Sequence, residues 1–153
     1  MARDTAFLLR RGILVLLVFG LSGVTVELVL LDHFEDVWQI MPFMSIGFAL
    51  ATMGWVVTSC SRTSLRAMRI AMVGLIVAGL TGLLLHYMSN REFQLDMDPS
   101  QSAWSLFSKV MHAQAPPALA PGVMAQLGLL GLLYAWRHPA SQVSHEIHQG
   151  DRT

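Results

Sequence analysis

Four apolar stretches, each bounded by polar or basic residues, organise this chain. They cover residues 12–31, 40–58, 67–86 and 118–136. Each approaches the roughly 20 apolar residues with which an α-helix crosses a bilayer core. The pattern predicts four transmembrane helices. We expect an all-α, up-down four-helix bundle formed by residues 1–136 as one domain, followed by a polar tail over residues 137–153.

The connections between these stretches are short, apart from one. Residues Asp32 to Glu35 match the capping-box pattern, which predicts a short helical turn between the first and second spans. The long connection covers residues 87–117. Its residues 92–98 alternate between polar and apolar, so we expect them to be extended.

A short surface helix is predicted in the second half of the long connection, over residues 101–112. Asp98 supplies a helix cap and Pro99 suits the first helical position. The helix would place its large apolar side chains on one stripe: Trp104, Phe107, Val110 and Met111. Such a stripe is typical of a helix that lies on the membrane surface, and equally of one that packs on the mouth of the bundle.

The first stretch also has two features of a secretory signal peptide, because Arg10 and Arg11 precede an apolar run. The run is long for a signal peptide, and it lacks an Ala-x-Ala cleavage site. We therefore expect it to remain as the first span.

Composition agrees with a membrane protein. Of the 153 residues, 54% are hydrophobic and only 13% are charged, whereas soluble domains carry about 25% charged residues. Basic and acidic residues number ten each, so the net charge gives no reason to expect a nucleic-acid partner. The single cysteine, Cys60, cannot form an internal disulfide.

The arginines indicate the orientation. One side of the predicted membrane carries Arg91 and Lys109, and the other carries Arg3, Arg10, Arg11, Arg62, Arg66, Arg69, Arg137 and Arg152. Because cytoplasmic loops are enriched in positive residues, both termini and the polar tail are expected to be cytoplasmic. The acidic and histidine-containing connections then lie on the outer side.

Small residues at four-residue spacing predict where helices approach closely. Gly74, Ala78 and Gly82 form such a series in the third span, and Gly47 with Ala51 does so in the second. This spacing is typical of tightly packed membrane helices. We expect both faces to lie inside the bundle.

Glu27 is the strongest single candidate for a functional residue. It lies inside the first apolar stretch, where a charge is costly unless it has a partner or faces a wet cavity. Gln126, His86 or a second protein could supply that partner. A proton or cation path through Glu27 is one interpretation.

Histidines near the same end suggest metal binding as an alternative. His33 and Asp36 are three residues apart, and the topology brings His86 to the same end. Imidazole and carboxylate groups together suit zinc, iron or manganese. Axial haem ligation by the two histidines, or copper binding by nearby methionines such as Met88, are weaker versions. Ordinary interfacial hydrogen bonds are the simpler explanation of both histidines.

No soluble-type catalytic motif is present. The sequence contains no nucleotide-binding loop, nucleophile elbow or zinc-protease signature. We expect a non-enzymatic accessory or docking subunit that presents an acidic, histidine-containing face. Its partner would be another membrane protein or a second copy, within the lipid bilayer.

Several segments together resemble a group of short four-span bacterial inner-membrane proteins of unassigned function. They are VELVLLDHFEDVWQIMPF, EFQLDMDPS with WSLF behind it, PPALAPG and YAWRHP. The resemblance covers most of the chain and implies the four-span topology and an inner-membrane location. It implies no catalytic or binding residue.

Overall fold

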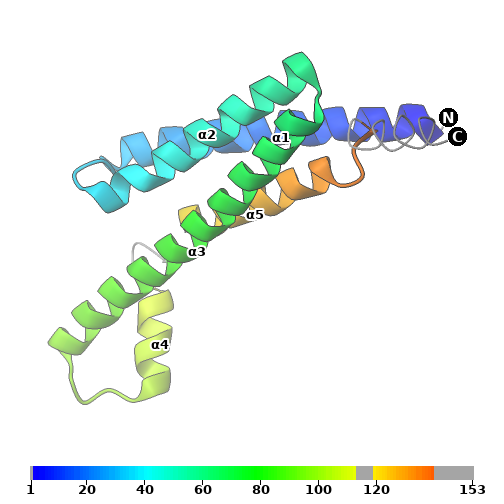
Figure 1. Ribbon diagram of the computed structural model, residues 1–153. Helices are drawn as coiled ribbons and strands as arrows, with labels where there is room; N and C mark the ends of the chain where they lie inside the picture. Colours follow the sequence, from blue (N-terminus) through cyan, green and yellow to red (C-terminus); the bar gives the residue numbers. More distant parts are fainter. Residues whose placement is uncertain (1, 113–118, 140–153) are drawn as a thin grey trace, which may run out of the picture.

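The computed structural model describes residues 2–112 and 119–139, and all regular structure in that part is α-helical. The polar tail from residue 140 onward lies outside the described residues. Figure 1 shows the helices α1 (Ala2–Leu30), α2 (Val37–Ser59), α3 (Arg62–Met97), α4 (Ala103–Met111) and α5 (Leu119–Ala135). The first three are long and apolar enough to cross a membrane, and α5 is a shorter apolar helix. The prediction of a helical fold is confirmed for the described residues, and three of the helices have the length and composition that a membrane span needs.

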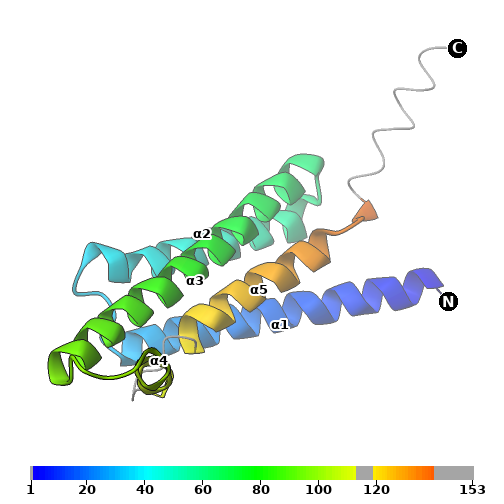
Figure 2. The same cartoon turned by 90° about the horizontal axis from the view of Figure 1, so that it is seen from below.

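Helix α3 is the centre of the assembly. It packs most extensively on α5 and then on α2, while α1 packs mainly on α5. Figure 2 shows the resulting order α1, α5, α3, α2. Helix α5 runs antiparallel to α3, because Pro121 lies against Gly79 whereas Ala135 accepts a hydrogen bond from Arg69.

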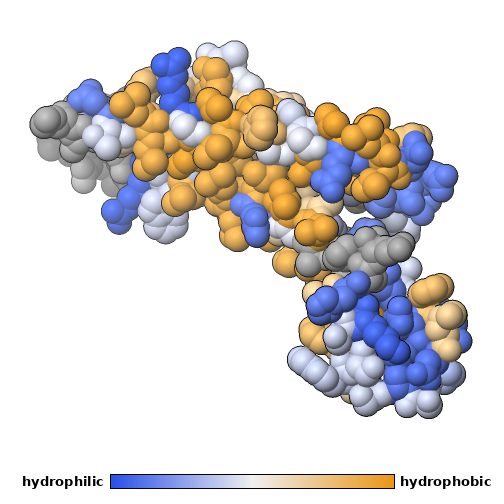
Figure 3. Space-filling model, turned by 180° about the vertical axis from the view of Figure 1, so that it is seen from behind, coloured by the Kyte–Doolittle hydropathy of each residue, from blue (hydrophilic) through white to orange (hydrophobic). Residues whose placement is uncertain are grey.

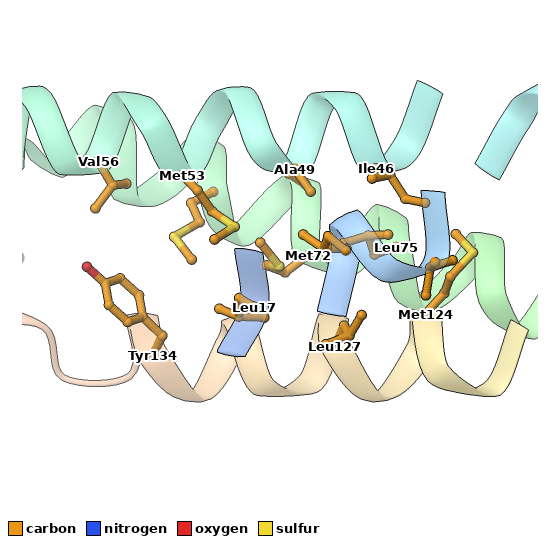
Figure 4. Close-up of a cluster of buried hydrophobic side chains, with 14 of the residues drawn as sticks. Leu17, Ile46, Ala49, Met53, Val56, Met72, Leu75, Met124, Leu127 and Tyr134 are labelled. Atoms are coloured by element: carbon orange, nitrogen blue, oxygen red, sulfur yellow. The ribbon is translucent and has the colours of Figure 1, made fainter. Parts of the chain in front are cut away.

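One hydrophobic core joins these four helices (Figure 4). Its side chains come from successive turns of each helix, among them Leu17 and Leu21 of α1, Ala49 and Met53 of α2, Met72 and Leu75 of α3, and Met124 and Leu127 of α5. Unbranched methionines adapt to irregular gaps between helices. The core therefore holds the four helices together as a single unit.

The closest helix approach is between α3 and α5, at glycines that the spacing rule did not select. A Cβ on Gly79 would stand 2.5 Å from the Pro121 carbonyl oxygen, and one on Gly128 would stand 2.7 Å from the Met72 carbonyl oxygen. By contrast, Gly74 and Gly47 have nothing within 4 Å of an added Cβ. The prediction that these small-residue faces lie inside the bundle is therefore wrong at Gly74 and Gly47. It holds at Gly82, whose added Cβ would stand 3.3 Å from the Pro121 side chain, and at Ala78, which packs against the core.

The long connection begins as helix. Helix α3 continues to Met97, so the extended conformation expected for residues 92–98 is wrong. Asp98 ends α3, where its carboxylate accepts hydrogen bonds from the backbone and hydroxyl of Ser100. These two hydrogen bonds lower the pKa of Asp98. Gln101 donates to the Gln94 carbonyl at 2.6 Å and joins the turn to the end of α3.

Helix α4 lies beside the far end of α3 and forms an arm with it (Figure 1). It begins after Ser102, whose hydroxyl accepts from the Ser105 amide, so Ser102 and not Asp98 is its N-cap. Val110 is fully buried, and the Phe107 ring lies 6.5 Å from that of Tyr87. The apolar stripe of α4 therefore packs partly against α3, and Trp104 remains exposed.

At the opposite end of the bundle, arginine side chains donate hydrogen bonds to the carbonyls at the end of α5. Arg10 donates to the Trp136 and Arg137 carbonyls, and Arg69 donates to the Ala135 carbonyl at 2.8 Å. A helix leaves its last carbonyls without partners inside the helix, so these arginines satisfy the C-terminal end of α5. His138 is buried beside this group, and burial, followed by the charges of Arg10 and Arg69, lowers its pKa.

The surface agrees with a membrane location for the bundle. Hydrophobic residues cover most of the bundle face in Figure 3, whereas the same view of the arm is largely hydrophilic. Many of the large apolar side chains of the bundle are exposed in the isolated chain, including Phe19 at 78% and Leu30 at 78%. Lipid is the natural partner of such a surface.

Candidate functional site

A cavity of about 440 Å³ lies at the end of the bundle where α1 ends and α2 begins. All four bundle helices contribute to it. Its walls are mostly apolar and come from Leu28, Leu31, Trp38, Pro42, Ala78, Gly82, Leu85, Leu119, Ala120, Pro121 and Met124. Its polar lining comes from Glu27, His33, Gln39, His86 and Ser89. The cavity thus gathers the acid and both histidines that the sequence singled out in this region.

The end of α1 explains how His33 reaches this cavity. Asp32 adopts the left-handed conformation, with φ of 49°. The amide of His33 then donates to the Leu28 carbonyl, and the amide of Asp32 donates to the Val29 carbonyl. These two hydrogen bonds form a Schellman motif, which ends a helix and folds the next residue back over its last turn. The chain reversal therefore carries His33 back toward Leu28.

His33 and His86 meet at the cavity. Their ring centroids are 5.9 Å apart with an interplanar angle of 28°, so the imidazoles are stacked. His33 comes from the turn after α1, and His86 comes from the C-terminal half of α3. The expectation that the ends of the first and third spans converge at these residues is confirmed.

Asp36 has a different role from the one expected. It is the N-cap of α2, and its carboxylate accepts from the Gln39 amide at 2.9 Å. The Gln39 side chain in turn accepts from the Glu35 amide at 2.7 Å. The cap is therefore built by Asp36 and Gln39, and not by the capping box predicted at Asp32 and Glu35. Asp36 does not line the cavity.

Metal ligands are not assembled in the part of the chain that the structure describes. No group of three or more His, Cys, Asp or Glu side chains there has the arrangement to hold a metal ion. His33 and His86 are together, whereas the Asp36 carboxylate caps α2. Metal binding by His33, Asp36 and His86 stays a prediction.

Glu27 lies in the last turn of α1 and lines the cavity. Within residues 2–112 and 119–139, its carboxylate has no hydrogen bond or ion pair. Of the two partners expected within the chain, His86 lines the same cavity and Gln126 does not. Glu27 is exposed in the isolated chain, but at membrane depth an acid beside a mostly apolar lining and without a charged partner would be costly.

Comparison with known proteins identifies no relative. No protein-family model, curated protein or solved structure matches the chain. The cavity and the arm therefore carry the functional argument.

Sequence reasoning missed several lining residues. Gln39 and Ser89 are polar residues close to span ends, and only their polarity in an apolar setting could have drawn attention to them. Pro121 belongs to one of the segments that carry the resemblance, and the structure places it against Gly79 and Gly82, where it contributes to the α5 wall of the cavity. Nothing in the local sequence indicates that contact.

Proposed function

We propose that this chain is a four-span inner-membrane protein with both termini in the cytoplasm and a docking arm on the outer side. Three helices of sufficient length support the spans. The fourth would be α5, whose 17 residues extend about 26 Å alongside α3. The arginines at the α5 terminus support the cytoplasmic assignment of that end.

The length of α3 is the observation that carries the docking proposal. Its 36 residues extend about 54 Å, whereas the hydrocarbon core of a bilayer is about 30 Å thick. A crossing by α3 leaves several turns outside the core. Helix α4 packs on those turns, so the arm is an ordered structure that can present side chains to another molecule.

The partner that fits the arm is a protein segment with an apolar groove and a basic rim. Phe93, Met97 and Trp104 are exposed on the arm, Trp104 at 76%. The acidic residues outnumber the basic ones, with Glu92, Asp96 and Asp98 against Arg91 and Lys109. Neither a second copy nor a surface of anionic lipid head groups would carry charge complementary to this small acidic excess. Charge complementarity therefore favours a basic partner protein.

Site-specific photo-cross-linking in cells tests the docking proposal. The photoreactive residue p-benzoylphenylalanine would replace Trp104, with Phe19 as the control position because its side chain is equally exposed on α1. We expect position 104 to form one discrete protein adduct and position 19 to form lipid adducts. Lipid adducts alone at both positions, or a self-adduct at position 104, would refute the basic-partner proposal.

Cysteine labelling tests the orientation separately. Cys60 is exposed and lies between α2 and α3, at the arginine-rich end. A membrane-impermeant maleimide should label Cys60 in inverted vesicles and not in intact cells. A Ser100→Cys variant in a Cys60→Ser background should show the reverse. Labelling of both positions from the same side would overturn the topology.

Metal binding is the second candidate function, favoured by the stacked His33 and His86 imidazoles. Zinc, iron or manganese would suit two imidazoles, although a further ligand would have to join them. Elemental analysis of protein purified without chelators tests it. Stoichiometric metal that disappears in His33→Ala and His86→Ala would support the site. Metal-free protein, or metal content unchanged in both variants, would eliminate it.

A further inference from the structure

The cavity at the end of α1 has the chemistry of a binding site for a hydrophobic organic cation, and we infer that it binds one through Glu27. The inference does not rest on the docking arm, since the arm and the cavity use different residues. It depends on the apolar lining, on the aromatic rings beside it and on the Glu27 carboxylate, which has no hydrogen bond or ion pair with any residue that the structure describes.

The charged side chains that line the cavity determine which sign of charge a ligand should carry. Within the described residues, no arginine or lysine lines the cavity, and the Glu27 carboxylate has no ion-pair partner. A carboxylate next to apolar surface gains most from a ligand that brings a positive charge to it. An anionic ligand would be repelled, and a neutral ligand would leave the acid without a counter-charge. A cationic ligand is therefore preferred.

The lining decides that the cation is organic. Hard metal cations such as Ca²⁺ require about six to eight oxygen ligands, and the described residues offer no group of three potential metal-binding side chains. Most of the walls are leucine, alanine, proline and methionine side chains, which favour contact with hydrocarbon. The volume of about 440 Å³ lies within the range of small-molecule sites.

Aromatic rings give the cation a second attraction. Trp38 lines the cavity together with the stacked imidazoles of His33 and His86. An indole face attracts a nearby cation more strongly than other aromatic side chains do. Trp38 and Glu27 are both exposed, so a ligand can reach them without opening the buried core.

Equilibrium dialysis of radiolabelled tetraphenylphosphonium against the full chain in a neutral detergent tests the inference. The protein should bind this hydrophobic cation saturably, at about one per chain. The neutral analogue triphenylphosphine oxide should compete poorly. Glu27→Gln should weaken binding at least about tenfold, as expected for loss of an ion pair in an apolar setting, and Glu27→Asp should retain most of it.

Two controls separate this result from a folding defect and from the docking proposal. Glu92→Gln removes an exposed carboxylate of the arm and should leave the affinity for tetraphenylphosphonium unchanged. Far-UV circular dichroism should show that Glu27→Gln keeps its helix content. Met97→Ser, a change at another exposed apolar position of the arm, should weaken the cross-link formed at position 104 without changing cation binding. Equal affinity of wild type and Glu27→Gln, equal affinity for the neutral analogue, or no saturable binding would each overturn the inference.

Discussion

Replacing Gly79 by alanine tests the most demanding contact in the fold, the approach of α3 to α5. The added Cβ would stand 2.5 Å from the Pro121 carbonyl oxygen and 2.9 Å from the Ala125 amide nitrogen. Ordinary van der Waals contact begins at 3.4 Å, so the helices must separate locally by the difference, 0.9 Å. Both opposing atoms belong to the backbone, which cannot move aside as a side chain can.

Two opposing effects set the expected magnitude. Overpacking a tight interface costs about 1–3 kcal/mol, while exchanging glycine for alanine in a helix gains up to about 1 kcal/mol. Gly74→Ala on the same helix provides the matched control, because nothing lies within 4 Å of its added Cβ. The propensity gain is common to both variants. Gly79→Ala should therefore be less stable than Gly74→Ala by about 1–3 kcal/mol.

Thermal unfolding in mild detergent, followed by far-UV circular dichroism, measures this difference. At about 2–4 °C per kcal/mol for a chain of this size, the Tm of Gly79→Ala should fall about 2–12 °C below that of Gly74→Ala. Gly128→Ala should behave like Gly79→Ala, since its Cβ would meet the Met72 carbonyl oxygen from the other side of the interface. If Gly79→Ala and Gly74→Ala had the same Tm, the close approach of α3 to α5 would be refuted.

Three further predictions concern the same fold. Arg69→Ala should destabilise the protein by about 1.5–3 kcal/mol, because the Ala135 carbonyl loses a charged donor. The control is Arg66→Ala, at an exposed position one turn away, whose stability in the same melts should stay within about 0.5 kcal/mol of wild type. Leu75→Ala should cost about 2–5 kcal/mol, since Leu75 is fully buried in the core, and an unchanged Tm would contradict that position. The lowered pKa of His138 means that the unfolded chain binds a proton more readily than the folded one. Stability should therefore fall as the pH drops below the ordinary value of 6.5 and be fully present above it. His138→Phe should remove that part of the pH dependence in melts from pH 5 to 8, and an identical slope would contradict it.

The helical elements were largely predictable because their signals are local. The lengths of the apolar stretches predicted the helices α1, α2, α3 and α5, and several of the predicted ends lie within a few residues of the observed ones. The excess of arginines marked one end of the bundle. The α3 terminus was not predictable in this way. Residues 92–98 alternate with the period of a strand, yet they continue α3, because the preceding helix and the packing of α4 outweigh a short alternating pattern.

The candidate site was predictable only in part. Topology alone indicated that His33 and His86 reach the same end, and their stacked rings bear this out. The role of Asp36 was not predictable, because Asp32 and Asp36 can both cap a helix. The choice depends on where α1 ends, and the left-handed Asp32 ends it early enough for Asp36 to cap α2.

The sequence by itself determined that this is a helical membrane protein with a charged asymmetry between its ends, since hydrophobic length and charge are properties of each segment alone. Only the tertiary structure decided which face of each helix is inside. Successive residues differ by about 100° around a helix, so Gly74, which belongs to the predicted small-residue series, points in a different direction from Gly79, which does not belong to it but meets α5. The same rotation brings Glu27 into a shared cavity with His33 and His86 and leaves its carboxylate without a protein partner among the described residues.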